Sequence, residues 1–442
     1  MLKYDVKRSE DFGKAVKNFE AEMEGWIGDC IEKHADAEPT DGHDQLTYTT
    51  AWEPYIRKTG NDRALPFMKD ARDATARHFR ESGAWQHGYW KMQEAHHGTE
   101  HFELFIGAIC RLDPDDQESV DQLLDAAEHF GNWSDAVPPW FNYETGLYRS
   151  IFFGAEGVRE EPGTELNAAD HLRCLNILLL AHDNGGGERY ADLAKTYGGK
   201  WAKALVEREQ IPLGLLESGP LYSLTDEMRS TYKRIVGMAG DLDDELERAE
   251  NLLASGGVDA LLKLWTLSDK DALYKKAAEK ILDLLATQLH DPCAGPAADA
   301  IRTYRRVTGD KRYDDAVIEA ADKLDPATIQ QIAMEPEVPR DTRPAGIGKR
   351  TDMPDWFENG KPRSHNPILL AVLAEIKDDE ALATEALDLA RAYMVLARQA
   401  YPDGREHGCS ARTVSAIARG HGRNNHAGMA TAVYGPLAEL FA

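Results

Sequence analysis

The stretch TGDKRYDDAV, residues 308–317, is a short polar turn that runs into a segment with helical spacing. Gly and Asp are residues that favour tight turns. Acidic side chains also suit the first turn of the helix that follows, because the amino end of a helix dipole is positive. The stretch therefore predicts two helices joined by a tight turn, which together form a helical hairpin.

Five further stretches of this kind occur along the chain, each a turn rich in Gly, Asp or Asn before an amphipathic segment. They are TGNDRAL (59–65), LDPDDQESV (112–120), NGGGERYADLA (184–194), LSDKDALYKKA (267–277) and IKDDEALATEA (376–386). Helical periodicity is common elsewhere, as at residues 66–79, whereas alternating β-branched runs are scarce. Because a helical hairpin cannot bury its apolar face alone, we predict an all-α protein of stacked hairpins.

Six such turns, and TGDKRYDDAV in particular, resemble those of the six-hairpin (α/α) toroids of many carbohydrate-active enzymes, among them polysaccharide lyases and glycoside hydrolases. The resemblance covers about residues 45–440 and implies an (α/α)6 or (α/α)7 toroid, an incomplete barrel of helical hairpins. The alternative is an open solenoid of the tetratricopeptide or HEAT type, but those repeats have a fixed period and these turns do not. We expect residues 1–45 to form an N-terminal helix and lead-in, and residues 46–442 to form a single toroid catalytic domain.

The composition restricts the partners of this chain. Its 442 residues carry a formal net charge of −25, which repels nucleic-acid phosphates and anionic lipids. No apolar run approaches the ~20 residues of a membrane span, so we predict no nucleic-acid partner and no membrane partner. The start, MLKYDVKRSEDFGK, has no apolar signal-peptide core. That predicts a cytoplasmic protein, or a periplasmic or secreted one if a signal peptide has been removed.

The stretch QEAHHGTEHFELF, residues 93–105, concentrates histidines and glutamates. We expect Gly98 to interrupt the helical pattern and Thr99 to cap a helix that begins near Glu100. This would place four polar side chains at a helix start, namely His96, His97, Glu100 and His101. Proton transfer by His97 is the sharper hypothesis, and a merely polar helix end is the plainer one. A divalent metal is a further alternative that the glycine disfavours, and we predict no metal ligand and no cofactor.

A second stretch, PPWFNYETGLYRSIFFG at residues 138–154, combines aromatic rings with Asn and Arg. Aromatic faces stack on sugar rings, and Arg binds carboxylates. The stretch resembles the N-W-x-x-E-I-G-x-P-R segment of toroidal polysaccharide lyases, although the Asn and the aromatic residue are shifted and Thr145 replaces Ile. The resemblance implies that Asn142 neutralises the uronate of the substrate. An aromatic core-facing segment is the plainer interpretation.

Three more segments carry clusters of polar residues at expected helix starts. They are GTELNAADHLR (163–173), the region from DMPDWFENGK to RSHNP (352–367), and GHGRNNHAGMATAVYGP (420–436). With the two stretches above, they supply all candidate site residues. We predict catalytic roles for His97 or His426 as base and for Tyr143 or Tyr434 as acid. We predict substrate contacts for Trp90, His96, Glu100, His101, Trp140, Asn142, Glu144, Arg149, Asp170, His171, Trp356, His365, Arg423, Asn424 and Asn425.

The chemistry of these clusters favours an enzyme acting on an acidic oligo- or polysaccharide. Lyase β-elimination needs a base, a proton donor and groups that stabilise an enolate, which suits segments rich in His, Asn, Tyr and Arg. Glycoside hydrolysis needs two carboxylates, and no pair stands out. We therefore predict a uronate-specific polysaccharide lyase, with a glycoside hydrolase such as a uronyl hydrolase as the first alternative. A sugar epimerase or isomerase and a non-catalytic scaffold are the remaining hypotheses.

Overall fold

The computed structural model describes residues 2–40, 44–232, 243–291, 294–323, 329–334, 367–400 and 426–441. These residues are mainly helical. The chain divides into two compact units. The first comprises Met1–Ala37, Tyr48–Phe67 and Leu285–Ala442, and the second comprises Glu38–Thr47 and Met68–Leu284. The predicted fold class, all-α of the (α/α) hairpin type, is confirmed.

All six predicted turns connect helical segments, as the order of elements shows. The pairs that they join are α3 (Glu53–Thr59) and α4 (Ala64–Glu81), α6 (Gly107–Leu112) and α7 (Gln117–Phe130), η4 (His182–Gly186) and α9 (Glu188–Glu207), α13 (Gly257–Leu267) and α14 (Ala272–Ala286), α15 (Gly295–Thr308) and α16 (Asp314–Asp322), and α17 (Pro367–Lys377) and α18 (Glu380–Ala400). Within the described residues, no helix combines the length and apolar character needed to cross a membrane.

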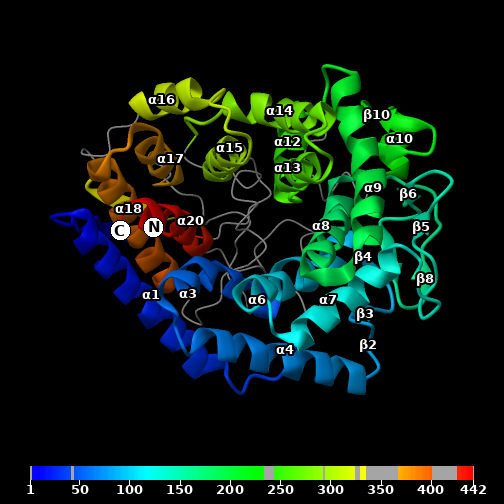
Figure 1. Cartoon of the computed structure of the whole chain (residues 1–442), viewed down its shortest axis with the longest axis horizontal. Helices are drawn as coiled ribbons and strands as arrows, with labels where there is room; N and C mark the ends of the chain where they lie inside the picture. The colour runs from blue at the N-terminus through cyan, green and yellow to red at the C-terminus, as the bar shows by residue number, and fades with distance from the viewer. Residues whose placement is uncertain are drawn as a thin grey trace. The chain divides into compact units, whose positions relative to one another are not determined.

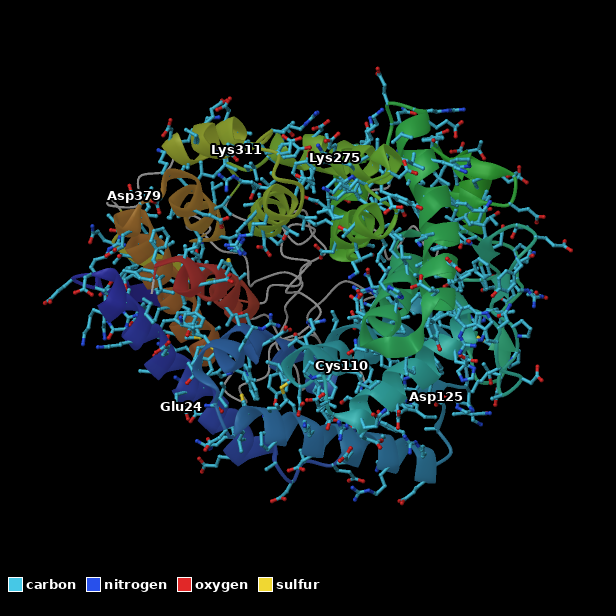
Figure 2. All side chains as sticks on the ribbon, in the orientation of Figure 1. Glu24, Cys110, Asp125, Lys275, Lys311 and Asp379 are labelled. Carbon is cyan, nitrogen blue, oxygen red and sulfur yellow. The ribbon has the colours of Figure 1, made fainter. Side chains whose placement is uncertain are left out.

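The turn TGDKRYDDAV shows why such a sequence makes a hairpin. Helix α15 is capped at its carboxyl end by Gly309, whose φ of 73° lies in the left-handed region that glycine adopts most readily. The hydroxyl of Tyr304 donates to Asp310 at 3.0 Å, and Arg305 Nε donates to Asp314 at 3.0 Å. These bonds fix the turn to the helices on both sides of it. Lys311 in this turn and Asp379 in the turn before α18 are labelled in Figure 2.

The first unit packs the N-terminal helix against the C-terminal ones. Helix α1 (Phe12–His34) is the predicted N-terminal helix, and it packs on α18, which in turn packs on α17 and on α20 (His426–Phe441). Figure 1 shows α1 in blue beside α18 in orange and α20 in red. The Phe19 and Tyr434 rings stack with centroids 4.8 Å apart. Strand β1 (Leu2–Asp5) pairs antiparallel with β11 (Gln331–Met334).

The second unit packs successive helices side by side. Helix α7 packs on α8 (Leu172–Ala181), α8 packs on α9, and α9 packs on α13. The inner helix α8 is buried along most of its length, from Leu172 to Leu179. The residues of α8 are apolar on nearly every face of the helix, which explains why it is buried. Further helices of this unit are α2 (Asp44–Thr47), α10 (Asp226–Thr231) and α12 (Glu245–Ala254), besides those that carry the site described below.

Short strands in the second unit are a feature that the sequence did not predict. They form a three-stranded sheet in the order β4–β7–β8 and three two-stranded hairpins. Strands this short carry too few residues for an alternating pattern to be visible. Their bounds are β2 (Trp85–Gln86), β3 (Tyr89–Trp90), β4 (Gln93–Glu94), β5 (Phe141–Asn142), β6 (Leu147–Tyr148), β7 (Phe152–Gly154), β8 (Gly157–Val158), β9 (Gly214–Leu216) and β10 (Gly219–Leu221).

Candidate functional site

The histidine-rich stretch forms the start of one continuous helical segment in the second unit. The segment runs from α5 (Ala95–Glu100) through a π-helical turn, η2 (His101–Ile106), and into α6. A π-helical turn holds one more residue than an α-turn, which costs regular hydrogen bonding, and such turns are frequent at functional sites. The turn begins at His101, the last of the four polar residues that the sequence singled out.

The expected break at Gly98 and the expected cap at Thr99 are wrong. Gly98 is buried inside α5, where the roughly 1 kcal/mol cost of a glycine in a helix is small enough for packing to offset. Thr99 Oγ1 donates back to the carbonyl oxygen of Ala95 at 2.6 Å instead of capping a new helix. The helix therefore begins at Ala95, and His96 and His97 lie in its first turn.

His96 is held between two carboxylates. Its Nε2 lies 3.0 Å from Glu100 Oε1, one turn further along the same helix. Its Nδ1 lies 3.3 Å from Asp170 Oδ1, which comes from η3 (Ala169–His171). The imidazole is 12% exposed and the Asp170 side chain is 24% exposed. The imidazole thus lies between two carboxylates and has a hydrogen bond to one of them, Asp170, and imidazole is a side chain that can hold and release a proton near neutral pH.

His97 forms a second pair of imidazole and carboxylate. Its Nδ1 lies 2.9 Å from Glu94 Oε1, on the residue that precedes α5. The Glu94 side chain is buried at 4% exposure, whereas that of His97 is 38% exposed. The carboxylate must accept the Nδ1 proton, so the neutral ring carries its lone pair on Nε2. His97 is therefore a partly exposed imidazole whose tautomer is set by Glu94.

A buried ion pair links Glu100 and Glu103 to helix α8. Arg173 on α8 lies 2.9 Å from Glu103 and 3.4 Å from Glu100, and the three side chains are at most 1% exposed. Asn176 donates to Glu103 at 2.7 Å and to the carbonyl of Ser255 at 3.0 Å. The guanidinium thus joins the π-helical turn to α8, and the amide joins both to the end of α12.

The surroundings of Asp170 and Glu94 keep these two carboxylates ionised. Burial opposes ionisation of Asp170, but the hydrogen bond from His96 and the charges of His96 and Arg173 outweigh it and hold the pKa of Asp170 well below its usual range. Burial likewise opposes ionisation of Glu94, but the hydrogen bond and charge of His97 lower its pKa. Both carboxylates therefore act as acceptors at neutral pH and not as acids.

This shift predicts a dependence of stability on pH. Because folding lowers the pKa of Asp170, its contribution to stability is present above the ordinary value of 3.8 and is lost as pH falls below it. We expect Asp170→Asn to lower the melting temperature most at neutral pH and progressively less below about pH 4. Thermal melts of both proteins between neutral and strongly acidic pH measure the difference. Asp192→Asn, on the exposed face of α9, is the control, and a gap for Asp170→Asn that does not change with pH would contradict the assignment.

Two further predicted residues of these segments are buried. His101 packs edge-on against Trp85 with ring centroids 5.1 Å apart. His171 stacks on Tyr148 and its Nε2–H donates to the carbonyl of Ser150 at 3.0 Å. Burial lowers the pKa of His171, which favours the neutral ring. Both histidines support the site from the core and do not offer a surface to substrate.

The stretch at 138–154 contains the β5–β6 hairpin and strand β7, which pairs with β4. Trp140 is 0% exposed and packs against Phe153, so the predicted sugar platform is wrong. The Asn142 side chain accepts from the backbone amide of Glu144 at 2.9 Å, which makes it a turn former. Tyr143 is exposed and donates to the carbonyl of Gly131 at 2.6 Å.

Two other predicted binding residues also have structural partners. Arg149 forms an ion pair with Glu160, with side chains 39% and 58% exposed. Trp90 packs against the Phe79 and Trp85 rings with centroids 4.8 and 5.5 Å away. Neither has a contact with the His96 and His97 pairs among those that the described residues show, so their predicted roles gain no support.

The predicted residues of segments 352–367 and 420–436 belong to the first unit or lie outside the described residues. Tyr434 is buried in the first unit, where its hydroxyl donates to Glu20 at 2.6 Å. Burial and Glu20 together raise its pKa far above the usual range, which makes it a poor proton donor. His426 is the first residue of α20. The remaining predictions lie outside the described residues, namely Trp356, His365, Arg423, Asn424 and Asn425.

The predicted site residues did not include four that build the site: Glu94, Glu103, Arg173 and Asn176. Glu103 stands three residues after Glu100, at the spacing that places both carboxylates on one helix face. That spacing was the available signal. Nothing in the sequence shows that Arg173, seventy positions further on, lies 2.9 Å from Glu103.

Comparisons with known proteins complete the description of the site. Neither the protein-family profiles nor the curated proteins contain a match. Among solved structures, the chain is similar to one described as a crystal structure of D-mannose isomerase. The two have 11% sequence identity and a TM-score of 0.44, over 85% of this chain and 97% of that chain. A similarity at this level leaves the chemistry of the cluster to be judged from its own contacts.

Proposed function

We propose that this protein is an enzyme that transfers protons on a small, neutral sugar, as an aldose–ketose isomerase or an epimerase does. The observation that carries the proposal is the pair of imidazole–carboxylate couples in the first turn of α5, His97 with Glu94 and His96 with Glu100 and Asp170. Imidazole is the side chain best suited to give and take protons near neutral pH. With two imidazoles side by side, one can exchange a proton with a carbon of the sugar and the other with an oxygen.

The roles follow from the hydrogen bonds. His97, with its Nδ1 proton held by Glu94, removes the proton from the carbon next to the sugar carbonyl. His96, held by Glu100 and Asp170, gives its proton to the carbonyl oxygen as the enediol forms. In the second half, His97 returns a proton to the neighbouring carbon on the same face of the enediol and His96 takes one from the hydroxyl on the first carbon, whereas an epimerase would need a proton donor on the opposite face. No electron is gained or lost overall, so no redox cofactor is required.

The charges of the site favour a neutral substrate over a uronate. The cluster holds four carboxylates, those of Glu94, Glu100, Glu103 and Asp170, and the guanidinium of Arg173 lies within 4.0 Å of the last three. Another carboxylate would be repelled there, because ionised groups of like sign disfavour each other strongly when partly buried. The predicted uronate binders Asn142 and Arg149 have other partners. The isomerase or epimerase alternative is therefore preferred to the lyase.

The same groups argue against a glycoside hydrolase. Hydrolysis requires a carboxylic acid whose pKa is raised so that it protonates the leaving oxygen. The pKa values of Glu94 and Asp170 are instead lowered. Glu100 and Glu103 have fully buried side chains, so neither offers the surface that a scissile bond would need.

A panel of neutral aldoses and ketoses incubated with the protein in deuterated water tests the proposal. We expect one or more sugars to change into an isomer or epimer while taking up deuterium at the carbon next to the carbonyl, as seen by proton nuclear magnetic resonance. Uronate oligosaccharides are assayed in parallel for ultraviolet absorbance and for new reducing ends. Chain cleavage there, with no exchange in the neutral sugars, would replace the isomerase by a lyase or a hydrolase.

A further inference from the structure

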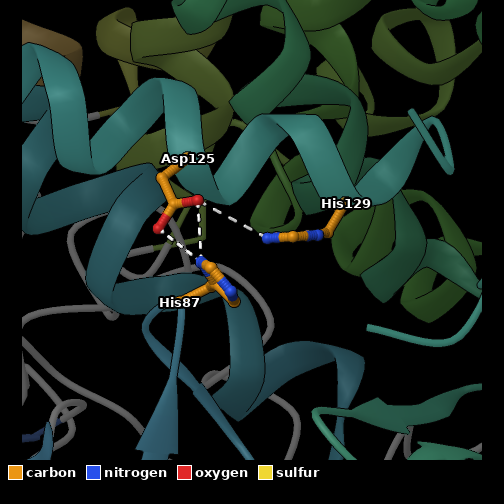
Figure 3. A group of neighbouring side chains, drawn as sticks. All are labelled: His87, Asp125 and His129. Atoms are coloured by element: carbon orange, nitrogen blue, oxygen red, sulfur yellow. Dashed lines mark hydrogen bonds and ion pairs between the residues drawn. The ribbon is translucent and has the colours of Figure 1, made fainter. Parts of the chain in front are cut away.

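A second group of imidazoles and a carboxylate lies elsewhere in the second unit, where the β2–β3 hairpin meets α7. His87 Nδ1 lies 2.9 Å from both carboxylate oxygens of Asp125, and His129 Nε2 lies 3.5 Å from Asp125 Oδ1. One donor atom from each residue falls within 4.8 Å of the others. Figure 3 shows the two imidazoles approaching the carboxylate from different elements.

Local structure explains how the three residues meet. Asp125 and His129 are one turn apart on α7, so both side chains lie on one face of the helix. His87 and Gly88 form the two-residue turn of the hairpin, with φ values of 55° and 79°. Positive φ at both positions is the requirement of a type I′ turn, at which Asn-Gly is the favoured pair. His87 thus occupies a backbone conformation that costs about 1–3 kcal/mol for most residues.

The turn of the hairpin is closely packed at Gly88. A Cβ on Gly88 would lie 2.1 Å from Phe102 Cζ, so the turn packs directly on the π-helical segment. This close approach fixes the direction from which His87 reaches α7. The His87 and His129 rings lie with centroids 4.6 Å apart.

His129 supplies an independent sign that a ligand belongs here. Its side chain is 1% exposed, between the rings of Tyr89 and Trp140. In the described part of the chain, neither ring nitrogen has a partner with hydrogen-bond geometry. Leaving a buried polar group unsatisfied costs about 1–3 kcal/mol. Its Nε2 points toward Asp125 (Figure 3), which is where a shared ligand would sit.

We propose that His87, Asp125 and His129 bind a zinc ion that joins the β2–β3 hairpin to α7. Two imidazole nitrogens and one carboxylate oxygen are a donor set that zinc takes readily, and water fills the fourth position. Donor atoms around a tetrahedral zinc are about 3.3 Å apart, given bonds of roughly 2.0–2.1 Å, and the observed 2.9 and 3.5 Å are close to that. Magnesium and calcium prefer oxygen ligands throughout.

The partial exposure of His87 and Asp125 allows the ion to reach the site from solvent. The side chains of His87 and Asp125 are 32% and 46% exposed, whereas His129 closes the inner side. The bound zinc would hold the β2–β3 hairpin in place. Two residues separate this hairpin from β4, the strand that leads into α5. The site is independent of the proposed sugar chemistry, and its role is to hold the segment that precedes the His96 and His97 pairs.

The test is zinc binding by the whole chain after removal of metal with a chelator. Zinc is titrated in competition with a chromophoric chelator, and cobalt is titrated separately because tetrahedral cobalt absorbs visible light. We expect one zinc per chain, and at least a tenfold weaker affinity in His87→Asn, Asp125→Asn and His129→Gln. Asn at position 87 tolerates positive φ, so that variant should keep the turn. His290→Asn, an exposed histidine of the first unit, is the matched control.

The outcomes separate this site from others. Added zinc should raise the melting temperature of the wild type and of His290→Asn, but not that of His87→Asn, while the metal-free proteins melt alike. Wild-type chain that takes up no zinc at micromolar concentrations would overturn the proposal. So would a loss of binding that follows His97→Asn instead of His87→Asn, because the ion would then belong to the other histidine cluster.

Discussion

Arg173→Met is expected to lower the free energy of unfolding by about 3–5 kcal/mol, the cost of leaving a buried charge without its partner. Arg173 is 1% exposed and contacts Glu103 at 2.9 Å and Glu100 at 3.4 Å. Methionine fills much of the space but leaves both carboxylates buried together with no cation between them. Urea unfolding followed by circular dichroism measures the change.

Arg149→Met is the matched control for this prediction. Arg149 also pairs with a glutamate, Glu160, but both side chains are largely exposed. Exposed ion pairs contribute only about 0–1 kcal/mol, so the control should unfold close to the wild type. Equal losses in the two variants would show that burial of the Arg173 pair does not matter. Adding Glu103→Gln to Arg173→Met should recover part of the loss, because it removes one uncompensated charge.

His97→Asn is expected to reduce turnover of the sugar by at least about 100-fold, the lower end of what general acid–base catalysis contributes. Asparagine keeps a hydrogen-bond donor for Glu94 but cannot accept the carbon-bound proton. KM should change little, because the residue acts on the reacting carbon. Deuterium uptake by the sugar should fall in parallel with turnover.

Two companion variants locate the effect. Glu94→Gln should lower kcat less than His97→Asn does and should shift the pH profile, because it alters the imidazole without removing it. His290→Asn, in the first unit, should leave both kcat and KM unchanged. If His97→Asn kept full activity while His96→Asn lost it, His97 would have no catalytic role and its assignment as the base would be wrong. If both kept full activity, the cluster would not be the catalytic site.

Local signals in the sequence were sufficient for the helical hairpins. Each predicted turn combines Gly, Asp or Asn with an amphipathic run, and turn formation depends on φ preferences and on bonds between near neighbours. Gly309 in its left-handed conformation and the Tyr304–Asp310 bond are both of this kind. The short strands escaped prediction because each has too few residues for an alternating pattern, and the pair Gln93–Glu94 with Phe152–Phe153 also depends on partners some sixty residues away.

The candidate site was predicted only in part. The sequence indicated the helix start at 93–105 and the polar segment at 163–173, and the structure joins them through His96 and Asp170. It did not indicate which polar residues have structural partners. Trp140 and Asn142 are residue types that are common in sugar-binding sites. In this fold, however, Trp140 packs in the core and Asn142 forms a turn. Residue type alone does not distinguish these uses, because the same ring or amide packs, caps or binds according to its surroundings.

The sequence by itself determined the all-α hairpin class and the place of the turns, since both depend on spacing and on the preferences of single residues. Only the tertiary structure decided that Glu94 lies behind His97, that Arg173 neutralises Glu103, and that His87 meets Asp125 and His129. The physical reason is that hydrogen bonds and ion pairs act over a few ångströms in space. The chain brings those partners together only after the helices have packed.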